Sequence, residues 1–343
     1  MRYFFLLALI LSSSVLVAQN DSPLLIGHLH DEKIDIIEYS IDGSISEIYT
    51  DGDRNRIPEY YKDGLILIQS PGLSILNLKS NSFFEIGEKS ELHFVGGFFK
   101  TKPWFFYSRM ITENSMPETV IYDYKLNKIF KVIDGFYPDL SIKDDNLFFM
   151  QAEIDSTGNE TKYFRDILRY DPKLDSIVVV TRHELSEYSK YDITEVKSIS
   201  SNKYYYRVYD EHEYRYYLDY RGEEQAFYSG GHGHYIDGLN KEQYDLCFSS
   251  DGRYAAFTER NWNEITYIVL IDLKQGKRYE LKAYGSFPMF HGDRLYYISD
   301  PDFYNTDDVS FRQIKDYALF YVNLSTREAK MAYDFEGGIS FVK

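Results

Sequence analysis

The stretch from Tyr244 to Leu281 constrains the fold of this chain more than any other part of the sequence. It reads as four short apolar strands, separated by the Asp251-Gly252 turn, a polar connection after Arg260 and a turn that contains Gly276. Aspartate and glycine accept the positive φ that tight hairpin turns require. The stretch therefore predicts one four-stranded antiparallel unit.

Weaker copies of this unit recur along the chain. Strands equivalent to its second strand begin at intervals of 41, 39, 43, 57, 50 and 41 residues. A period near 40 residues is typical of the four-stranded blades of a β-propeller. The strands begin at Leu24, Leu65, Trp104, Leu147, Tyr204, Tyr254 and Leu295.

The residues around these strands repeat as well. A short polar turn precedes each strand from the second onward, and the third strand of a unit ends in Asp or Asn. The expected strand-ending residues are Asn77, Asp123, Asp171, Asp219, Asp272 and Asn323.

The two ends of the chain complement each other. The first unit has three strands but no innermost strand before Leu24, whereas residues 336–342 form an additional strand after the last unit. We expect this C-terminal strand to complete the N-terminal blade, which removes an open sheet edge. The prediction is an all-β propeller of four-stranded antiparallel blades, with seven blades and six as the alternative.

The sixth unit resembles a known repeat. Phe248 to Phe257, followed by Ile268 to Asp272 and Gly276, is similar to the repeat of TolB-like propellers and to the WD40-like (PD40-type) repeat in the propellers of prolyl oligopeptidase relatives. The resemblance covers about one unit as a motif and the other units as a pattern. It implies the propeller fold and a periplasmic or secreted setting, and it implies no catalytic residues.

The N-terminus has the features of a secretory signal peptide. Arg2 precedes an apolar run, and Ala18 precedes the polar Gln19-Asn20. Residues 1–18 are therefore expected to be removed on export, with a retained anchor as the alternative, and residues 19–343 to form a single propeller domain. Cys247, the one cysteine, lies in a strand and is expected to be a buried thiol.

The composition restricts the classes of molecule that the protein is expected to bind. The net charge of −16 argues against nucleic acid and anionic membrane surfaces, which require clusters of Lys and Arg. No further apolar run is long enough to span a membrane after signal cleavage. The 34 Tyr and 24 Phe suit β-structure, in which rings pack across strands.

Long connections are expected on one face of the propeller. In a four-stranded blade, the connections between second and third strands and the links between blades lie on the same face. Binding residues commonly lie on such loops, so this face is the expected functional one. The long connections are residues 109–118, 152–165, 182–192, 229–241 and 300–316.

Two of these connections carry the candidate site residues. His232 and His234 follow glycines, and paired imidazoles can share a metal ion if Asp237, His183 or an acid near residue 300 adds a third ligand. The alternative is a flexible glycine-rich link with solvated histidines. The second connection is acidic and aromatic and could bind a cation or a basic peptide, or could simply be solvated; its candidates are Asp300, Asp302, Tyr304 and Asp307.

A second His-x-His pair, His28 and His30, lies near a strand end and is not expected to bind metal. No cofactor motif is present, and a divalent metal remains the one open possibility. No nucleophile elbow, phosphate loop or dinucleotide fingerprint occurs. The favoured function is a non-catalytic exported propeller that binds a protein, peptide or glycan through its long-loop face. The alternatives are a metal-assisted lyase or hydrolase with a site near the axis, and a structural role in an assembly.

Overall fold

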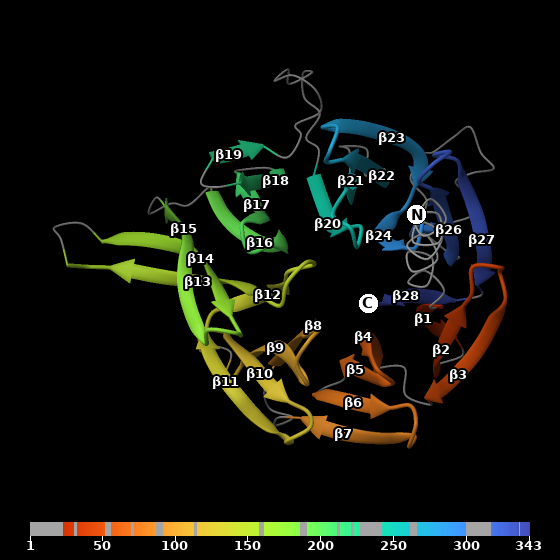
Figure 1. Ribbon diagram of the computed structural model, residues 1–343, viewed down its shortest axis with the longest axis horizontal. Helices are drawn as coiled ribbons and strands as arrows, with labels where there is room; N and C mark the ends of the chain where they lie inside the picture. Colours follow the sequence, from red (N-terminus) through yellow and green to blue (C-terminus); the bar gives the residue numbers. More distant parts are fainter. Residues whose placement is uncertain are drawn as a thin grey trace, which may run out of the picture.

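The computed structural model describes a propeller of four-stranded antiparallel sheets arranged around a centre (Figure 1). All regular elements in the described residues are strands, so no helix among them could cross a membrane. The described residues are 23–30, 33–51, 56–69, 72–86, 92–112, 115–157, 161–185, 191–210, 213–220, 223–226, 242–260, 266–299, 317–335 and 337–343.

Each sheet has its strands in chain order from the centre outward, except that the first sheet takes its innermost strand from the C-terminus. The first sheet has the order β28 (Gly338–Val342), β1 (Leu24–His30), β2 (Lys33–Tyr39) and β3 (Ile45–Asp51). The second contains β4 (Ile57–Lys62), β5 (Leu65–Gln69), β6 (Leu73–Asn77) and β7 (Ser82–Ile86). The third contains β8 (Leu92–Phe98), β9 (Trp104–Met110), β10 (Glu118–Asp123) and β11 (Lys128–Asp134).

The remaining four sheets follow the same order. The fourth contains β12 (Phe136–Leu140), β13 (Leu147–Asp155), β14 (Lys162–Asp171) and β15 (Ser176–Leu185). The fifth contains β16 (Tyr191–Ser200), β17 (Lys203–Asp210), β18 (Glu213–Tyr220) and β19 (Glu223–Ala226). The sixth contains β20 (Glu242–Phe248), β21 (Tyr254–Arg260), β22 (Thr266–Asp272) and β23 (Lys277–Tyr284). The seventh contains β24 (Ser286–His291), β25 (Arg294–Ser299), β26 (Tyr317–Asn323) and β27 (Ala329–Phe335).

The second strand of each sheet is buried on both faces. In β13 the side chains from Leu147 to Met150 are all fully buried, because this strand lies between two neighbouring sheets. Such strands read as continuous apolar runs in the sequence. The fourth strands are outermost and more exposed. In β11, for example, Phe130 and Val132 each have about two fifths of their surface exposed to solvent. The strands used to find the repeat are thus the core strands.

Apolar side chains join each sheet to the next. Leu67 and Ile75 of the second sheet pack with Phe105 and Tyr107 of the third. The last and first sheets are joined in the same way, since Tyr296 and Ile298 pack with Leu24 and Ile26. Aromatic rings contribute much of this contact area, as expected from the composition.

The two ends of the chain share the first sheet. β28 pairs antiparallel with β1, with Leu25 opposite Val342 and Leu29 opposite Gly338. The predicted use of a C-terminal strand to complete the N-terminal sheet is confirmed by this pairing. Beyond the strand, the Lys343 backbone exchanges hydrogen bonds with the second sheet, at Glu59 O (2.8 Å) and Tyr61 N (2.7 Å).

The predicted Asp and Asn residues at the ends of third strands shape the next turn. Asp272 Oδ1 accepts hydrogen bonds from the backbone N–H groups of Lys274 and Gln275, both at 3.0 Å. Asn323 Oδ1 accepts equivalent bonds from Ser325 (2.9 Å) and Thr326 (3.2 Å). The same arrangement, in which a side-chain oxygen replaces a backbone acceptor, occurs at Asn77, Asp123 and Asp171.

The turns between first and second strands contact one another at one end of the ring, the plain end. Asp145 accepts hydrogen bonds from the backbone N–H groups of Lys100 (2.7 Å) and Thr101 (2.8 Å) in the preceding sheet. Asp144 accepts one from Ser201 in the following sheet (2.9 Å). The connections between second and third strands and the links between sheets lie at the opposite end, the elaborated end, which is the face expected to be functional.

Two of the expected long connections are largely strand. The connection expected over residues 152–165 is shorter, because β13 continues to Asp155 and β14 begins at Lys162. The link expected over residues 182–192 is reduced to residues 186–190 by the ends of β15 and β16. Together β13, β14 and β15 project from the ring (Figure 1). Arg182 pairs across these strands with the buried Asp166 (Nη2–Oδ2, 2.6 Å) and with Glu153.

We expect replacement of Asp272 to separate turn formation from charge pairing. Asp272→Asn keeps the turn acceptor and loses the ion pair with Arg253 (3.0 Å), whereas Asp272→Ala loses both and should cost about 1–2 kcal/mol of unfolding free energy. Burial raises the pKa of Asp272, but the N–H donors and Arg253 outweigh it and lower the pKa. Its charge therefore stabilises the fold fully above pH ~4, and this stabilisation is lost as pH falls through the native pKa.

Urea unfolding at pH 7 and pH 3 tests this expectation. The difference between wild type and Asp272→Asn should shrink at the lower pH. Asn323→Ala removes an equivalent turn acceptor without changing charge, so its cost should be the same at both values. An Asp272→Asn cost that does not depend on pH would contradict the assigned role of the charge.

Gly285 is a second position where the fold makes a sharp prediction. It links β23 to β24 at φ +154°, and a Cβ there would lie 2.4 Å from the backbone oxygen of Ile298. Gly285→Ala should lower the unfolding free energy by about 2–3 kcal/mol, since both conformation and contact oppose a side chain. Gly43→Ala is the matched control, because its φ is +89° but nothing lies within 4 Å. Denaturant unfolding measures the loss of unfolding free energy in each variant. Equal losses at Gly285 and Gly43 would show that the close contact with Ile298 contributes nothing to the cost.

Candidate functional site

Most of the predicted site residues lie outside the described part of the chain. His232, His234 and Asp237 fall in residues 227–241, and the acidic candidates Asp300, Asp302, Tyr304 and Asp307 fall in residues 300–316. Their roles remain predictions.

His183 lies on β15 opposite Arg165, on the projecting strands of the fourth sheet. Its ring centroid is 5.1 Å from that of Tyr206 on β17, so the imidazole packs between the fourth and fifth sheets. Among the residues that the structure describes, His183 is not part of a cluster of three potential metal ligands.

A different set of side chains converges at the elaborated end of the first sheet. His28 and His30 are alternate residues of β1, so they project from the same face of the strand. Asp35 of β2 lies directly opposite His28 in the antiparallel register. The antiparallel pairing of β1 with β2 brings the carboxylate beside both imidazoles. These three residues are called the histidine–aspartate cluster below.

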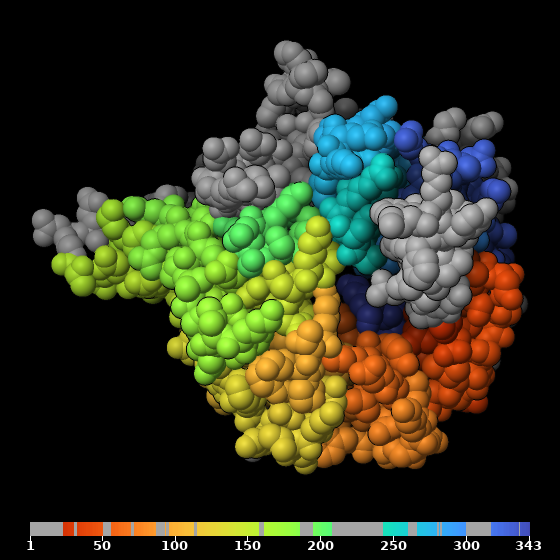
Figure 2. All heavy atoms as spheres, viewed as in Figure 1, coloured from red at the N-terminus to blue at the C-terminus, as the bar shows by residue number. Residues whose placement is uncertain are grey.

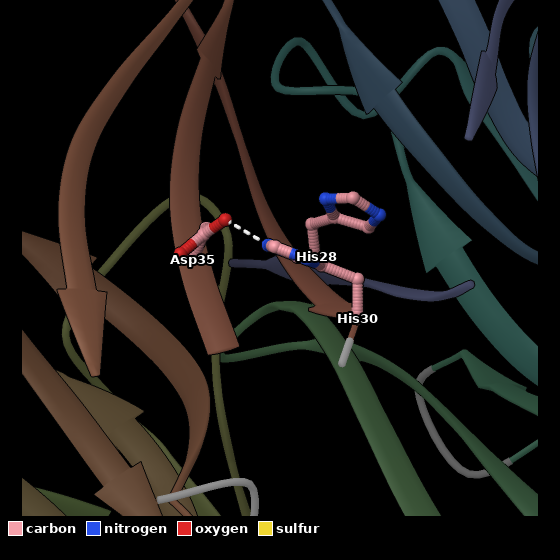
Figure 3. A group of neighbouring side chains, drawn as sticks. All are labelled: His28, His30 and Asp35. Atoms are coloured by element: carbon pink, nitrogen blue, oxygen red, sulfur yellow. Dashed lines mark hydrogen bonds and ion pairs between the residues drawn. The ribbon is translucent and has the colours of Figure 1, made fainter. Parts of the chain in front are cut away.

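The geometry of the histidine–aspartate cluster is close. One ligand atom from each residue lies within 4.8 Å of the other two. His30 Nε2 hydrogen-bonds Asp35 Oδ2, and the His28 ring stacks on the His30 ring with centroids 4.7 Å apart and planes at 25° (Figure 3). Phe335, at the end of β27 in the last sheet, packs against His28 with ring centroids 5.1 Å apart. The cluster therefore lies at the junction between the first and last sheets.

Asp35 is a buried carboxylate, with 6% of its surface exposed. Burial alone raises its pKa, but the hydrogen bond with His30, the nearby Thr50 and the charges of both imidazoles more than compensate and lower the pKa below its ordinary value. Asp35 is thus an anion at neutral pH. His30 is more open, with a third of its side chain exposed. A solute can therefore approach the cluster from the imidazole side.

Two imidazole nitrogens and a carboxylate oxygen are a donor set for divalent transition-metal ions. The same groups could also bind a polar ligand or transfer protons. The sequence indicated the two histidines but not their partner. The available signal was Asp35 itself, a charged residue between Ile34 and Ile36 in an apolar strand, because a buried charge requires compensation.

The innermost strands carry a second group of charges toward the centre of the ring. Lys197 of β16 lies 3.3 Å from Asp139 of β12 and 3.4 Å from Glu195. Burial opposes the charge on Lys197, but the two carboxylates outweigh it and raise the pKa of this lysine. Asp139 also accepts hydrogen bonds from the backbone and hydroxyl of Ser198 (2.8 and 3.1 Å). These charges compensate one another, which indicates a structural role in holding adjacent sheets together.

Cys247 is expected from the sequence to be a buried thiol, and the structure places it half-buried on β20, packed against the core between the sixth and seventh sheets. Burial raises the pKa of Cys247 to about 12, so the thiol stays protonated at neutral pH. A protonated thiol is a poor nucleophile. Figure 2 shows the C-terminal segment in dark blue at the centre of the molecule, set back between the sheets.

The sequence of the chain matches no protein-family model and no curated protein. Similar solved structures are propellers. A prolyl endopeptidase has 10% identity and a TM-score of 0.56 over 94% of this chain and 50% of the other. Oligogalacturonate lyase from Vibrio parahaemolyticus has 11% identity and a TM-score of 0.54, over 91% and 86%. TolB from Acinetobacter baumannii has 12% identity and a TM-score of 0.46, over 93% and 83%.

These similarities concern the fold. The chain spans about half the length of the prolyl endopeptidase, so that protein contains a large part with no counterpart here. At identities of 10–11% the prolyl endopeptidase and the lyase show the fold alone and do not favour catalysis over binding. The expected propeller fold of antiparallel four-stranded blades is confirmed.

Proposed function

We propose that this chain is an exported propeller that binds a protein, peptide or glycan at the elaborated end of its ring. In this proposal residues 1–18 are a signal peptide and residues 19–343 form one domain of the TolB-like repeat type. The seven four-stranded sheets are seven blades, and β28 closes the ring within the first blade. The protein acts in the periplasm or outside the cell.

The histidine–aspartate cluster carries this proposal. It brings two half-buried imidazoles, of which His30 has a third of its side chain exposed, and a buried anion together at the elaborated end, where second strands end and connections begin. The plain end, in contrast, uses its carboxylates Asp144 and Asp145 on backbone N–H groups of adjacent turns. These carboxylates of the plain end are thus committed to joining adjacent sheets.

Charge favours some partners over others. The chain carries 54 acidic and 38 basic residues, which disfavours nucleic acid and favours neutral glycans or basic peptides. Neutral glycans also suit a protein with many tyrosines, because aromatic faces stack on sugar rings, although the fully buried Tyr205 and Tyr206 serve the core instead.

A second candidate function is catalysis by a metal-assisted lyase or hydrolase. The specific observation that favours it is the donor set of His28, His30 and Asp35, because three protein ligands would leave a coordination position for substrate or water. Oligogalacturonate lyase shares the fold, which makes uronate oligosaccharides a reasonable first substrate class to assay.

Binding screens with two matched variants test the main proposal. Purified protein is applied to glycan and basic-peptide arrays, and the affinity of each hit is measured for wild type, a His28→Ala/His30→Ala variant and Lys79→Ala. We expect the double variant to bind at least about tenfold more weakly, since loss of buried polar contacts costs over a kilocalorie. Lys79 is exposed in a turn at the plain end, so its replacement should have no effect.

Two results would count against the binding proposal. One is affinity that falls in Lys79→Ala but not in the double variant, which would move the binding face to the plain end. The other is turnover of uronate oligosaccharides by wild type that the double variant lacks, which would favour the enzyme.

Export makes a separate prediction. If residues 1–18 are a cleaved signal peptide, mass spectrometry of the protein recovered from its native cells should find Gln19 as the first residue. Fractionation should place it outside the cytoplasm. A mature N-terminus at Met1 in the cytoplasmic fraction would reject both the cleavage and the location.

A further inference from the structure

We propose that His28, His30 and Asp35 form a binding site for one divalent first-row transition-metal ion at the junction between the first and last sheets. The proposal does not rest on the proposed ligand-binding function, because a metal site here could serve stability alone. It also reverses the expectation from sequence that the His28-Leu29-His30 pair does not bind metal.

Geometry is the first support. Ligands of a tetrahedral ion with bonds near 2 Å lie about 3.3 Å from one another. The three ligand atoms of the cluster already lie within 4.8 Å of one another. The His30–Asp35 hydrogen bond is the closest of these contacts, and small side-chain rotations would bring the third atom to coordination distance. Both histidines are on one strand and Asp35 is on its ladder partner, so the backbone already holds the three positions.

The buried carboxylate of Asp35 is the second support. Its Oδ2 contacts His30, whereas Oδ1 is buried and accepts no hydrogen bond from the described residues. The Thr50 hydroxyl lies near this carboxylate but donates to Glu47. An unsatisfied buried oxygen is costly, and in native proteins such atoms commonly have a water or an ion as the missing partner. A metal ion that Asp35 binds through both of its oxygens would supply that partner.

The donor set specifies the class of ion. Imidazole nitrogen suits zinc, cobalt, nickel and copper, whereas calcium and magnesium prefer sites made of oxygen atoms only. Two imidazoles and one carboxylate therefore favour Zn²⁺ or Co²⁺ over Ca²⁺ or Mg²⁺. Three protein ligands leave one tetrahedral position open, on the side where His30 is exposed.

The position of the site links metal binding to the completion of the first sheet. β1, which carries both histidines, lies between β2 and the C-terminal β28. Phe335 packs on His28, and Gly337 approaches Leu29 so closely that a Cβ there would lie 2.2 Å from the Leu29 oxygen. An ion that fixes β1 to β2 would stabilise the strand that receives the C-terminus. Binding should therefore raise the melting temperature by about 5 °C at a hundredfold excess over Kd.

The experiment is calorimetric titration of ZnCl₂ into the full chelator-treated protein, with Co²⁺ absorption and thermal unfolding as further readouts. We expect one Zn²⁺ per chain, visible Co²⁺ bands typical of nitrogen and oxygen ligands, and no competition by Ca²⁺. His30→Gln and Asp35→Asn should each weaken Zn²⁺ binding at least tenfold and abolish the thermal shift. Unfolding of the metal-free variants verifies that they are folded, and Asp35→Asn preserves the side-chain shape.

Two control variants separate this site from others. His291→Gln replaces a histidine at the plain end of β24, and it should bind Zn²⁺ as wild type does. His232→Gln/His234→Gln removes the glycine-flanked pair and should also leave the tight site intact. The proposal is overturned if wild type binds no stoichiometric Zn²⁺, if His30→Gln and Asp35→Asn bind it unchanged, or if the His232/His234 variant alone loses it.

Discussion

Packing between neighbouring sheets is the interaction on which the whole structure depends. Within a sheet the strands are joined by hydrogen-bonded ladders, but one sheet meets the next mainly through side chains such as Phe105 and Tyr107 against Leu67 and Ile75. Each second strand must therefore be apolar on both faces, and large rings fill the wedge between sheets. This requirement explains why 58 of the residues are Tyr or Phe, and why the four residues Leu147 to Met150 of β13 are fully buried.

The parts of the fold that sequence predicts are those with local causes. Burial of a strand on two faces produces a continuous apolar run in the sequence. An Asp or Asn at the end of a third strand shapes the next turn, because its side-chain oxygen accepts hydrogen bonds from the backbone N–H groups two and three residues ahead. Both signals are visible in a window of ten residues. The projecting strands of the fourth sheet have no such local signal. Their projecting parts are rich in polar residues, and pairs such as Arg182 with Asp166 join residues 16 positions apart, so the sequence alone suggested a loop.

The candidate site was only half predictable for a related reason. The His-x-His spacing of β1 is visible in the sequence, but its meaning depends on the residue that the ladder places opposite. That register puts Asp35 across from His28, and it is the register in which Ile34 and Ile36 are buried. A buried aspartate in an apolar strand was the one clue to a partner. The glycine-flanked His232 and His234 had a more conspicuous pattern, although pattern alone carries no information about the third ligand.

The location of the histidine–aspartate cluster follows from the way the chain ends meet. The first sheet is assembled from both ends of the sequence. Its strand β1 pairs with β28, which comes from the other end of the chain. Phe335 and Gly337, which lead into β28, contact His28 and Leu29. Any ligand that orders the cluster thus also orders the strand on which the C-terminus docks. If a ligand binds at the cluster as proposed, its binding and the completion of the first sheet would be coupled through the same few residues, and each would strengthen the other.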